Sequence, residues 1–233
     1  IDKDILLAAD ILFRHRLNKT GLKSLPNKLM PKTIAESYQI QNEVKILYLT
    51  LKDNICIGKK VGCTNKIAQE QVGIFEPFYG NLFSKFHDFT GCKLNSKKFY
   101  KPFIEPEISF ILKKDININD APFTINNVDS LFDGILPSIE IVDFRFGDNI
   151  KDVGIKNLII TNGASEFWVR GNEIFPINSI DLKNHEIKLY FDNELKEIGN
   201  VNSVLGNPIY SALWLVNKLS ELKQWYRNDT EIL

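Results

Sequence analysis

The chain has 233 residues, and its 29 acidic and 29 basic residues give a formal net charge of zero. This balance excludes the basic surplus typical of proteins that bind nucleic acid or membrane surfaces. Hydrophobic residues make up 44% of the chain, which excludes a disordered polymer and is enough for a sizeable core. Three cysteines without a C-x-x-C pair indicate neither a disulfide framework nor a thiolate zinc site, so we expect a cytoplasmic protein.

Two helices are predicted in the first part of the chain. The first runs over residues 4–17 and begins at Asp4, which can cap it. The second begins at Thr33, because Thr33 and Glu36 have the spacing of a capping box. We therefore expect residues 1–52 to form an N-terminal helical segment.

The pattern changes after residue 52 to a mixture in which strands dominate. Gly73 ends a short helix, Pro77 and Gly80 mark a loop, and Asn207 followed by Pro208 begins the last helix. Strands are expected at 55–63, 104–112 and 138–146, a helix at 124–135, and a hairpin at 187–198. Because strands and helices do not alternate regularly, we expect an α+β fold, β-rich, with peripheral helices.

The strongest local feature is the Ile-Glu-Pro-Glu-Ile motif at 104–108. Residues two apart in a strand point to the same face, so Glu105 and Glu107 are expected side by side. Glu140 lies inside another apolar strand, and buried glutamates are rare unless they are paired or bind a metal. A hard divalent cation would satisfy all three with oxygen ligands. From spacing alone a structural interpretation is favoured, in which the first two line a wet edge strand and Glu140 pairs with Arg145 or a lysine.

Lys60 belongs to an adjacent lysine pair, Lys59 and Lys60, inside a strand rich in glycine. One lysine of such a pair should face inward, although solvation of both, with the inner one snorkelling, is the favoured interpretation. Beside a metal site, an inward Lys60 would serve as an acid–base group or would anchor a substrate carboxylate.

Several motifs follow one another from the second helix to the end of the chain. They are GKKVGCT at 58–64, QEQVG at 69–73, EPFYG at 76–80, IEPEISF at 104–110, LPSIEIV at 136–142, and GNP at 206–208 with Trp214-Leu215. In this order they resemble the 2-keto-4-pentenoate hydratases and 4-oxalocrotonate decarboxylases of the fumarylacetoacetate hydrolase superfamily. The resemblance implies a fumarylacetoacetate-hydrolase-like β-roll or sandwich core after the N-terminal helices, and a homo-oligomer.

The resemblance also implies a metal site and a reaction. Glu105, Glu107 and Glu140 would bind Mg²⁺ or Mn²⁺, and Lys60 would be the catalytic lysine. The implied activity is hydration of 2-hydroxypenta-2,4-dienoate-like 2-oxo acids through a metal-stabilised enolate, a lyase reaction of aromatic compound catabolism.

Four further residues are predicted to bind the substrate: Gly62, Cys63, Asn162 and Ser165. A packing role for Cys63 and a turn-stabilising role for Ser165 remain open as alternatives.

Other functions remain open on the same scaffold. A 2-oxo-diacid decarboxylase or an acylpyruvate hydrolase would use the same metal site. A non-catalytic metal-binding homologue is a further alternative, because Asn162-Gly163, Phe78 and Asn207 depart from the family pattern. The weakest of these alternatives is a calcium-binding β domain, in which the carboxylates would bind the ion for a structural purpose. Since typical members continue past Leu233, we expect a C-terminal strand and loop to be missing from the catalytic domain at 53–233.

Overall fold

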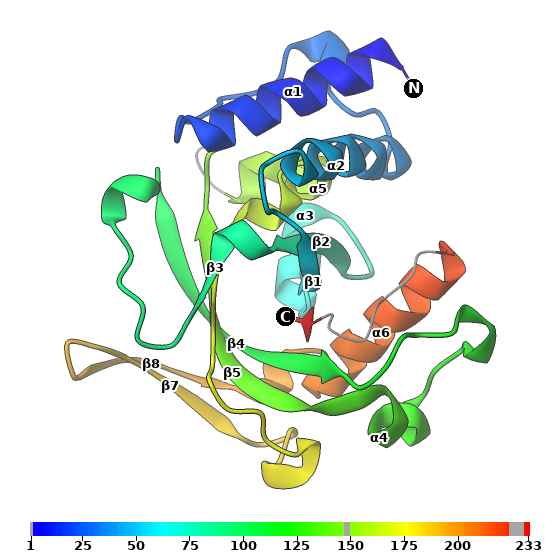
Figure 1. Cartoon of the computed structure of the whole chain (residues 1–233), viewed down its shortest axis with the longest axis vertical. Helices are drawn as coiled ribbons and strands as arrows, with labels where there is room; N and C mark the ends of the chain where they lie inside the picture. The colour runs from blue at the N-terminus through cyan, green and yellow to red at the C-terminus, as the bar shows by residue number, and fades with distance from the viewer. Residues whose placement is uncertain (1, 147–149, 224–230) are drawn as a thin grey trace.

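The computed structural model describes residues 2–146, 150–223 and 231–233. The two N-terminal helices, α1 (Lys3–Leu17) and α2 (Ile34–Leu49), pack against each other at one end of the molecule (Figure 1). The cap of α1 is Asp2 rather than Asp4, because the Asp2 carboxylate accepts from the Asp4 N–H. Thr33 caps α2 as predicted, but the Glu36 carboxylate accepts from the backbone N–H of Lys32, so the capping box is not reciprocal.

A seven-stranded mixed sheet forms the body of the molecule. Its strands lie in the order β2-β1-β9-β4-β5-β6-β3. Their bounds are β1 (Cys56–Gly62), β2 (Phe78–Phe83), β3 (His87–Phe89), β4 (Pro102–Leu112), β5 (Phe132–Asp143), β6 (Ser165–Arg170) and β9 (Glu231–Ile232). A separate hairpin, β7 (Glu186–Phe191) and β8 (Glu194–Asn200), turns at Asp192 and Asn193 with positive φ, as predicted.

The remaining helices lie around the sheet. They are α3 (Lys66–Val72), α4 (Val128–Leu131), α5 (Ile150–Ile160) and α6 (Pro208–Glu221), with 3₁₀ turns η1 (Asn27–Leu29), η2 (Ser84–Phe86), η3 (Ser96–Lys98), η4 (Ile118–Asp120), η5 (Ile125–Asn127), η6 (Asn162–Ala164), η7 (Ile177–Ser179) and η8 (Val201–Ser203). Gly73 ends α3 with φ 73°, and Asn207 caps α6 with Pro208 at its first position. These three local predictions are confirmed.

Two sequence predictions about boundaries are wrong. The helix expected at 124–135 stops at Leu131, and the next residues already belong to β5, where the backbone of Phe175 pairs with Ile135. Gly80 does not mark a loop but lies in β2, where it pairs with Lys60 of β1. In both places pairing with a distant strand prevails over the local turn and helix signals.

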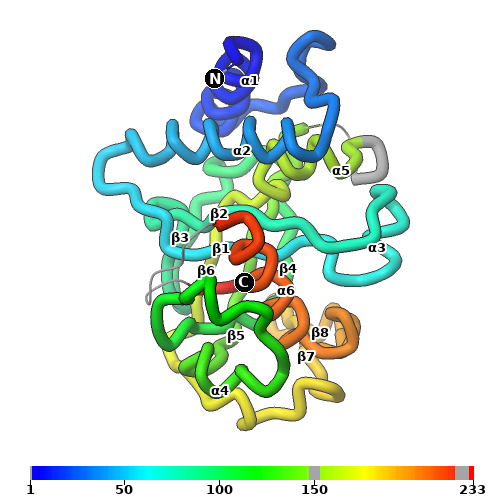
Figure 2. The backbone as a smooth tube through the Cα atoms, turned by 90° about the vertical axis from the view of Figure 1, so that its right-hand side faces the viewer, coloured from blue at the N-terminus to red at the C-terminus, as the bar shows by residue number. Residues whose placement is uncertain are grey.

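The sheet curls, so that its two arms face each other across the interior. Figure 1 shows β1 and β2 above β4 and β5, and Figure 2 shows α4 at the opposite end from α1 and α2, with α6 between them. One buried cluster joins α6 to the sheet through residues such as Phe110, Leu215 and Ile232, and a second lies under α1, α2 and α5. Among the residues that the structure describes, no helix has the length and apolar character needed to cross a bilayer. The curl brings β1 close to β5, although two strands separate them in the sheet.

Candidate metal centre

Three carboxylates converge inside the curled sheet. Glu105 and Glu107 lie on β4, and Glu140 lies directly across from Glu105 on the neighbouring strand β5. Each of the three offers a carboxylate oxygen within 4.8 Å of the others. Side chains two apart on one strand and directly opposite on the next share one face, so the local register places all three together. The sequence prediction that these glutamates lie together is therefore confirmed; that they bind a metal stays a prediction.

Lys60 reaches this cluster from β1. Its Nζ lies 2.7 Å from Oε2 of Glu140, and the two side chains are 6% and 1% exposed. Burial alone would lower the pKa of Lys60, but the charge of Glu140, with smaller effects of Glu105 and Glu107, raises the pKa above its usual value. Lys60 is therefore a charged ammonium at neutral pH. The interpretation that it snorkels to solvent is wrong.

One ammonium does not balance three carboxylates. Burial, followed by the charges of Glu105 and Glu140, raises the pKa of Glu107 to about 8. Burial also raises the pKa of Glu105, although Lys60 opposes the rise. Oε1 of Glu140 is buried without a hydrogen-bond partner among the described residues. An all-oxygen donor set, an excess of negative charge and an orphaned carboxylate oxygen fit a hard divalent cation.

The simpler interpretations of the carboxylates can now be compared with the geometry. Glu140 pairs with a lysine, Lys60, and not with Arg145, which instead contacts Asp143 and Glu166. At Glu105 the strand is exposed and pairs with β5 alone, because β9 reaches only Phe110 and Ile111. The wet-edge interpretation, made for Glu105 and Glu107, therefore describes Glu105, whereas Glu107 is only partly exposed.

Gly62 and Cys63 lie where β1 ends, close to Phe78. A Cβ added at Gly62 would lie 2.5 Å from the Phe78 ring, so glycine allows this close approach. Cys63 has a positive φ of 56° and is partly buried. Burial raises the pKa of the Cys63 thiol to about 11, so the thiol stays protonated at neutral pH and is a poor nucleophile. Substrate binding by Gly62 and Cys63 stays a prediction.

Asn162 and Ser165 are both buried; Asn162 begins the turn η6, and Ser165 begins β6. The Asn162 side chain accepts from the backbone N–H of Asn81 at 2.6 Å and donates to the Asn81 carbonyl at 2.8 Å. The next residue, Gly163, approaches Lys60, since a Cβ there would lie 3.2 Å from its Nζ. Asn162 thus holds a turn against Lys60. Substrate binding by Asn162 and Ser165 stays a prediction.

Sequence reasoning missed a pair of serines beside the carboxylates. Ser109 follows Glu107 by two residues on β4, and Ser138 lies opposite Glu107 on β5. Their hydroxyl oxygens are 2.7 Å apart and both side chains are buried. The two-residue spacing from Glu107 is the signal that could have identified Ser109.

The fold is fumarylacetoacetate-hydrolase-like, and its curled sheet holds three carboxylates that form a candidate divalent-metal centre. A solved fumarylacetoacetate hydrolase family protein from Yersinia pestis has the same kind of fold, with a TM-score of 0.51, 11% identity, and coverage of 76% of this chain and 80% of its own. No protein-family model matches the chain.

Other proteins are more similar, and their matches cover most of this chain. The 4-oxalocrotonate decarboxylase of Pseudomonas sp. (strain CF600) is 26% identical over 217 residues, which cover 93% of this chain and 80% of that protein. The 2-keto-4-pentenoate hydratase of Burkholderia vietnamiensis is 28% identical over 166 residues, which cover 71% and 62%. The 4-oxalocrotonate decarboxylase of Pseudomonas putida G7, solved with calcium and acetate, superposes with a TM-score of 0.88 at 24% identity, over 99% and 86% of the two chains. The predicted resemblance and fold are confirmed.

Proposed function

We propose that this protein is a divalent-metal-dependent hydratase, a carbon–oxygen lyase, that acts on 2-hydroxypenta-2,4-dienoate-like 2-oxo acids. The observation that carries the proposal is the convergence of Glu105, Glu107 and Glu140, with oxygens within 4.8 Å of one another, beside the Lys60 ammonium. The three glutamates would hold Mg²⁺ or Mn²⁺. Such a cation, when bound, supplies a Lewis acid for negative charge on a substrate oxygen.

The names of the relatives support this choice of chemistry. Several are 2-keto-4-pentenoate hydratases or a 2-hydroxypent-2,4-dienoate hydratase. The decarboxylase of Pseudomonas putida G7 has been solved with magnesium and adipate as well as with calcium and acetate. Divalent cations and carboxylates thus occur together in a protein of this fold, and the carboxylate cluster of the present chain offers the same donor chemistry.

Lys60 is the residue that would move the proton. Hydration of the dienol adds a hydroxyl group to C4 and a proton to C5; loss of the enol proton from the C2 oxygen and addition of a proton to C3 then give the 4-hydroxy-2-oxo acid. The Lys60 ammonium is buried, lies 2.7 Å from Glu140 and has a raised pKa, so it keeps a proton available inside the site. The hydrogen bond to Glu140 orients the Lys60 ammonium, and the turn at Gly163 packs closely against one side of it.

Decarboxylation of a 2-oxo diacid is the second candidate. The decarboxylase of strain CF600 matches 93% of this chain, and the decarboxylase of Pseudomonas putida G7 superposes on it with a TM-score of 0.88. Loss of CO₂ breaks a carbon–carbon bond and leaves an electron pair that takes up a proton on carbon. Lys60 would supply that proton from the same position.

A substrate panel followed by ultraviolet absorbance separates the two reactions. Purified protein with Mg²⁺ is given 2-hydroxypenta-2,4-dienoate in one arm and 2-oxo-3-hexenedioate in the other. Loss of dienol absorbance with formation of 4-hydroxy-2-oxopentanoate supports the hydratase, whereas release of CO₂ supports the decarboxylase. Absence of turnover in both arms would reject both functions.

Comparison of the variant Glu107→Gln with the control variant Glu194→Gln tests whether the activity depends on the carboxylate cluster. Glu194 lies exposed on the β7–β8 hairpin and shares no contact with the cluster. Glu107→Gln should reduce turnover by at least about 100-fold, and Glu194→Gln should leave it unchanged. Full activity in Glu107→Gln would reject the metal role of this residue.

A further inference from the structure

Lys59 is a second buried lysine, on the opposite face of β1 from Lys60. The residue is 8% exposed, and its Nζ donates to Oδ1 of Asn81 at 2.6 Å. Within the described ranges 2–146, 150–223 and 231–233, no carboxylate lies within 4.0 Å of this Nζ. An ammonium has three donors, so Lys59 is buried with a neutral partner and without a counter-ion.

Burial is the main reason why the surroundings of Lys59 disfavour its charge. Burial, and to a lesser degree the like charge of Lys45, lowers the pKa of Lys59 to about 8, while Cys56 opposes the shift. At neutral pH the side chain therefore still carries most of its charge. The partners of Lys59 are uncharged: the Asn81 amide and the Tyr79 ring, whose centroid lies 5.6 Å from Nζ. A buried charge without a counter-ion destabilises the folded state, and an anion placed against it would reduce that penalty.

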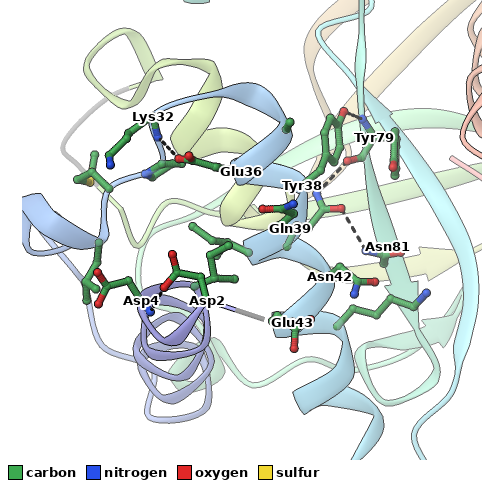
Figure 3. A pocket seen from close by; sticks show the side chains of 18 of the residues that line it. Asp2, Asp4, Lys32, Glu36, Tyr38, Gln39, Asn42, Glu43, Tyr79 and Asn81 are labelled. Carbon is green, nitrogen blue, oxygen red and sulfur yellow. Dashed lines mark hydrogen bonds between the residues drawn. The ribbon is translucent and has the colours of Figure 1, made fainter.

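Lys59 and Lys45 both line a cavity of about 620 Å³. The cavity lies between α2 on one side and β1 and β2 on the other, and α1 and the segment before α2 close its far end (Figure 3). Its volume falls within the range of small-molecule sites. The cavity lies away from the candidate metal centre, since Glu105, Glu140 and Lys60 are not among its lining residues.

Four acidic residues line this cavity, and three of them, Asp2, Asp4 and Glu36, lie away from Asn81, the partner of Lys59; the fourth is Glu43 on α2. Figure 3 shows Asp2, Asp4 and Glu36 at the side of α1 and the segment before α2, whereas Asn81 lies at the side of the strands. Glu36 is already engaged with the backbone N–H of Lys32. The part of the cavity beside Lys59 is thus free of these three acids.

The wall beside the strands has two further features. The rings of Tyr38 and Tyr79 stack with their centroids 4.6 Å apart and an interplanar angle of 18°, and both residues line the cavity. The Asn81 amide accepts from Lys59 and donates to Gln41, so it holds the lysine at this wall. A ligand there would meet an ammonium with free donor positions and a flat aromatic surface.

We propose that the cavity between α2 and the β1–β2 arm is a second ligand site, which binds a small carboxylate or phosphate anion against Lys59 and Lys45. The anion accepts from the N–H groups of Lys59 that Asn81 leaves free. It replaces the missing counter-ion of the buried ammonium. This site does not depend on the proposed metal centre, because none of the three glutamates and neither Lys60 nor the substrate takes part in it.

Calorimetric titration of the full chain with benzoate and, separately, with inorganic phosphate tests this proposal. The titrations are made at pH 7 in a Tris buffer of low chloride, with Mg²⁺ and again with EDTA, because a metal-bound carboxylate would be lost in EDTA. At least one anion should bind in both conditions with a Kd of about 1 mM or tighter. Binding of benzoate alone identifies a carboxylate site, and binding of phosphate alone identifies a phosphate site.

Lysine variants locate the binding. Lys59→Met should weaken the affinity at least tenfold, Lys59→Arg should keep most of it, and Lys28→Met, at an exposed lysine of the same cavity, should change it little. If Lys59→Met does not fold, Lys45→Met takes its place and should weaken binding several-fold. The proposal is overturned if neither anion binds the wild type in EDTA, or if the variants of Lys59 and Lys45 that fold bind as tightly as wild type.

Discussion

The ammonium of Lys60 lies 2.7 Å from the Glu140 carboxylate, although β1 and β5 are not neighbours in the sheet. Strands β9 and β4 separate them, so the two side chains can meet only because the sheet curls. The contact joins residues 80 positions apart in the chain. The three carboxylates lie together on the neighbouring strands β4 and β5, but Lys60 reaches them only because the sheet curls.

Lys60→Met is expected to separate metal binding from catalysis. Without divalent cation, the variant should lose about 3–5 kcal/mol of unfolding free energy, because Glu140 is left buried beside two further carboxylates. Mg²⁺ should bind at least as tightly as in wild type, since a competing positive charge has gone. Turnover should fall by about 100-fold or more, because the proton donor is missing.

Urea unfolding, calorimetry with Mg²⁺ and the substrate assay give these three quantities for Lys60→Met. Lys218→Met, which removes a surface ion pair with Glu76, serves as the control and should leave all three nearly unchanged. Retention of wild-type turnover in Lys60→Met would contradict the proposed role of this lysine.

Glu107→Gln should remove the response to metal without unfolding the protein. Burial and the charges of Glu105 and Glu140 raise the pKa of Glu107 to about 8, so its carboxyl is largely protonated at pH 7 when no cation is bound. Glutamine resembles that protonated form, and the melting temperature in EDTA should stay close to that of wild type. Saturating Mg²⁺ should stabilise wild type by about 3 kcal/mol at 100-fold excess over its Kd, and the variant by much less.

Thermal shift assays of wild type, Glu107→Gln and Glu194→Gln measure this difference. The same assay with Ca²⁺ distinguishes the proposed enzyme from a structural calcium domain, since the proposal expects the larger shift with Mg²⁺ or Mn²⁺. An Mg²⁺ shift in Glu107→Gln as large as in wild type would remove this residue from the centre.

Local signals in the sequence predicted the parts of the fold that depend on neighbouring residues. Thr33 caps α2, Gly73 ends α3, and Glu105 and Glu107 share a face because of their two-residue spacing. Long-range pairing was not visible in the same way. Gly80 suggested a loop, yet it pairs with Lys60 in the β1–β2 arm.

The buried lysines show the limit of reasoning from one strand. Alternation places Lys59 and Lys60 on opposite faces, and the favoured expectation was that both are solvated. Both are buried, because α2 covers one face of β1 and the curled sheet encloses the other. The resemblance to known enzymes suggested a role for Lys60, whereas nothing in the sequence indicated the burial of Lys59.

Asn162 should prove important for the stability of the turn beside Lys60. Asn162→Ala removes two buried hydrogen bonds to the Asn81 backbone. It also places alanine, which has no polar side chain to support this conformation, at a φ of 58°. We expect a loss of about 2–4 kcal/mol in unfolding free energy. Asn162→Gly should lose about 1 kcal/mol less, because glycine adopts positive φ freely.

Urea unfolding of the two Asn162 variants provides the comparison. The order wild type, glycine, alanine in decreasing stability supports a structural role of the side chain. An alanine variant within about 0.5 kcal/mol of wild type would show that the two hydrogen bonds to Asn81 contribute little.

Lys59 should give the protein a pH dependence at alkaline pH. Its pKa is lowered to about 8 in the folded chain, from 10.5, so the unfolded chain binds the proton more tightly. The contribution of Lys59 to stability is therefore unfavourable below pH 8 and improves as the pH rises from about 8 to 10.5, by up to about 1.4 kcal/mol per pH unit.

The difference between wild type and Lys59→Met isolates this contribution from other groups that titrate in the same range. At pH 7, in a buffer without carboxylate or phosphate, Lys59→Met should be at least as stable as wild type, and its advantage should shrink towards pH 10. An advantage that is constant across this range would mean that the pKa of Lys59 is not lowered.

Anomalous scattering from a crystal soaked with Mn²⁺ tests the central claim most directly. The claim predicts one strong peak between β4 and β5, about 2.1 Å from a carboxylate oxygen of each of Glu105, Glu107 and Glu140, and loss of that peak in Glu140→Gln. A crystal that binds Mn²⁺ elsewhere, or leaves these three glutamates without a cation at saturating Mn²⁺, would contradict it.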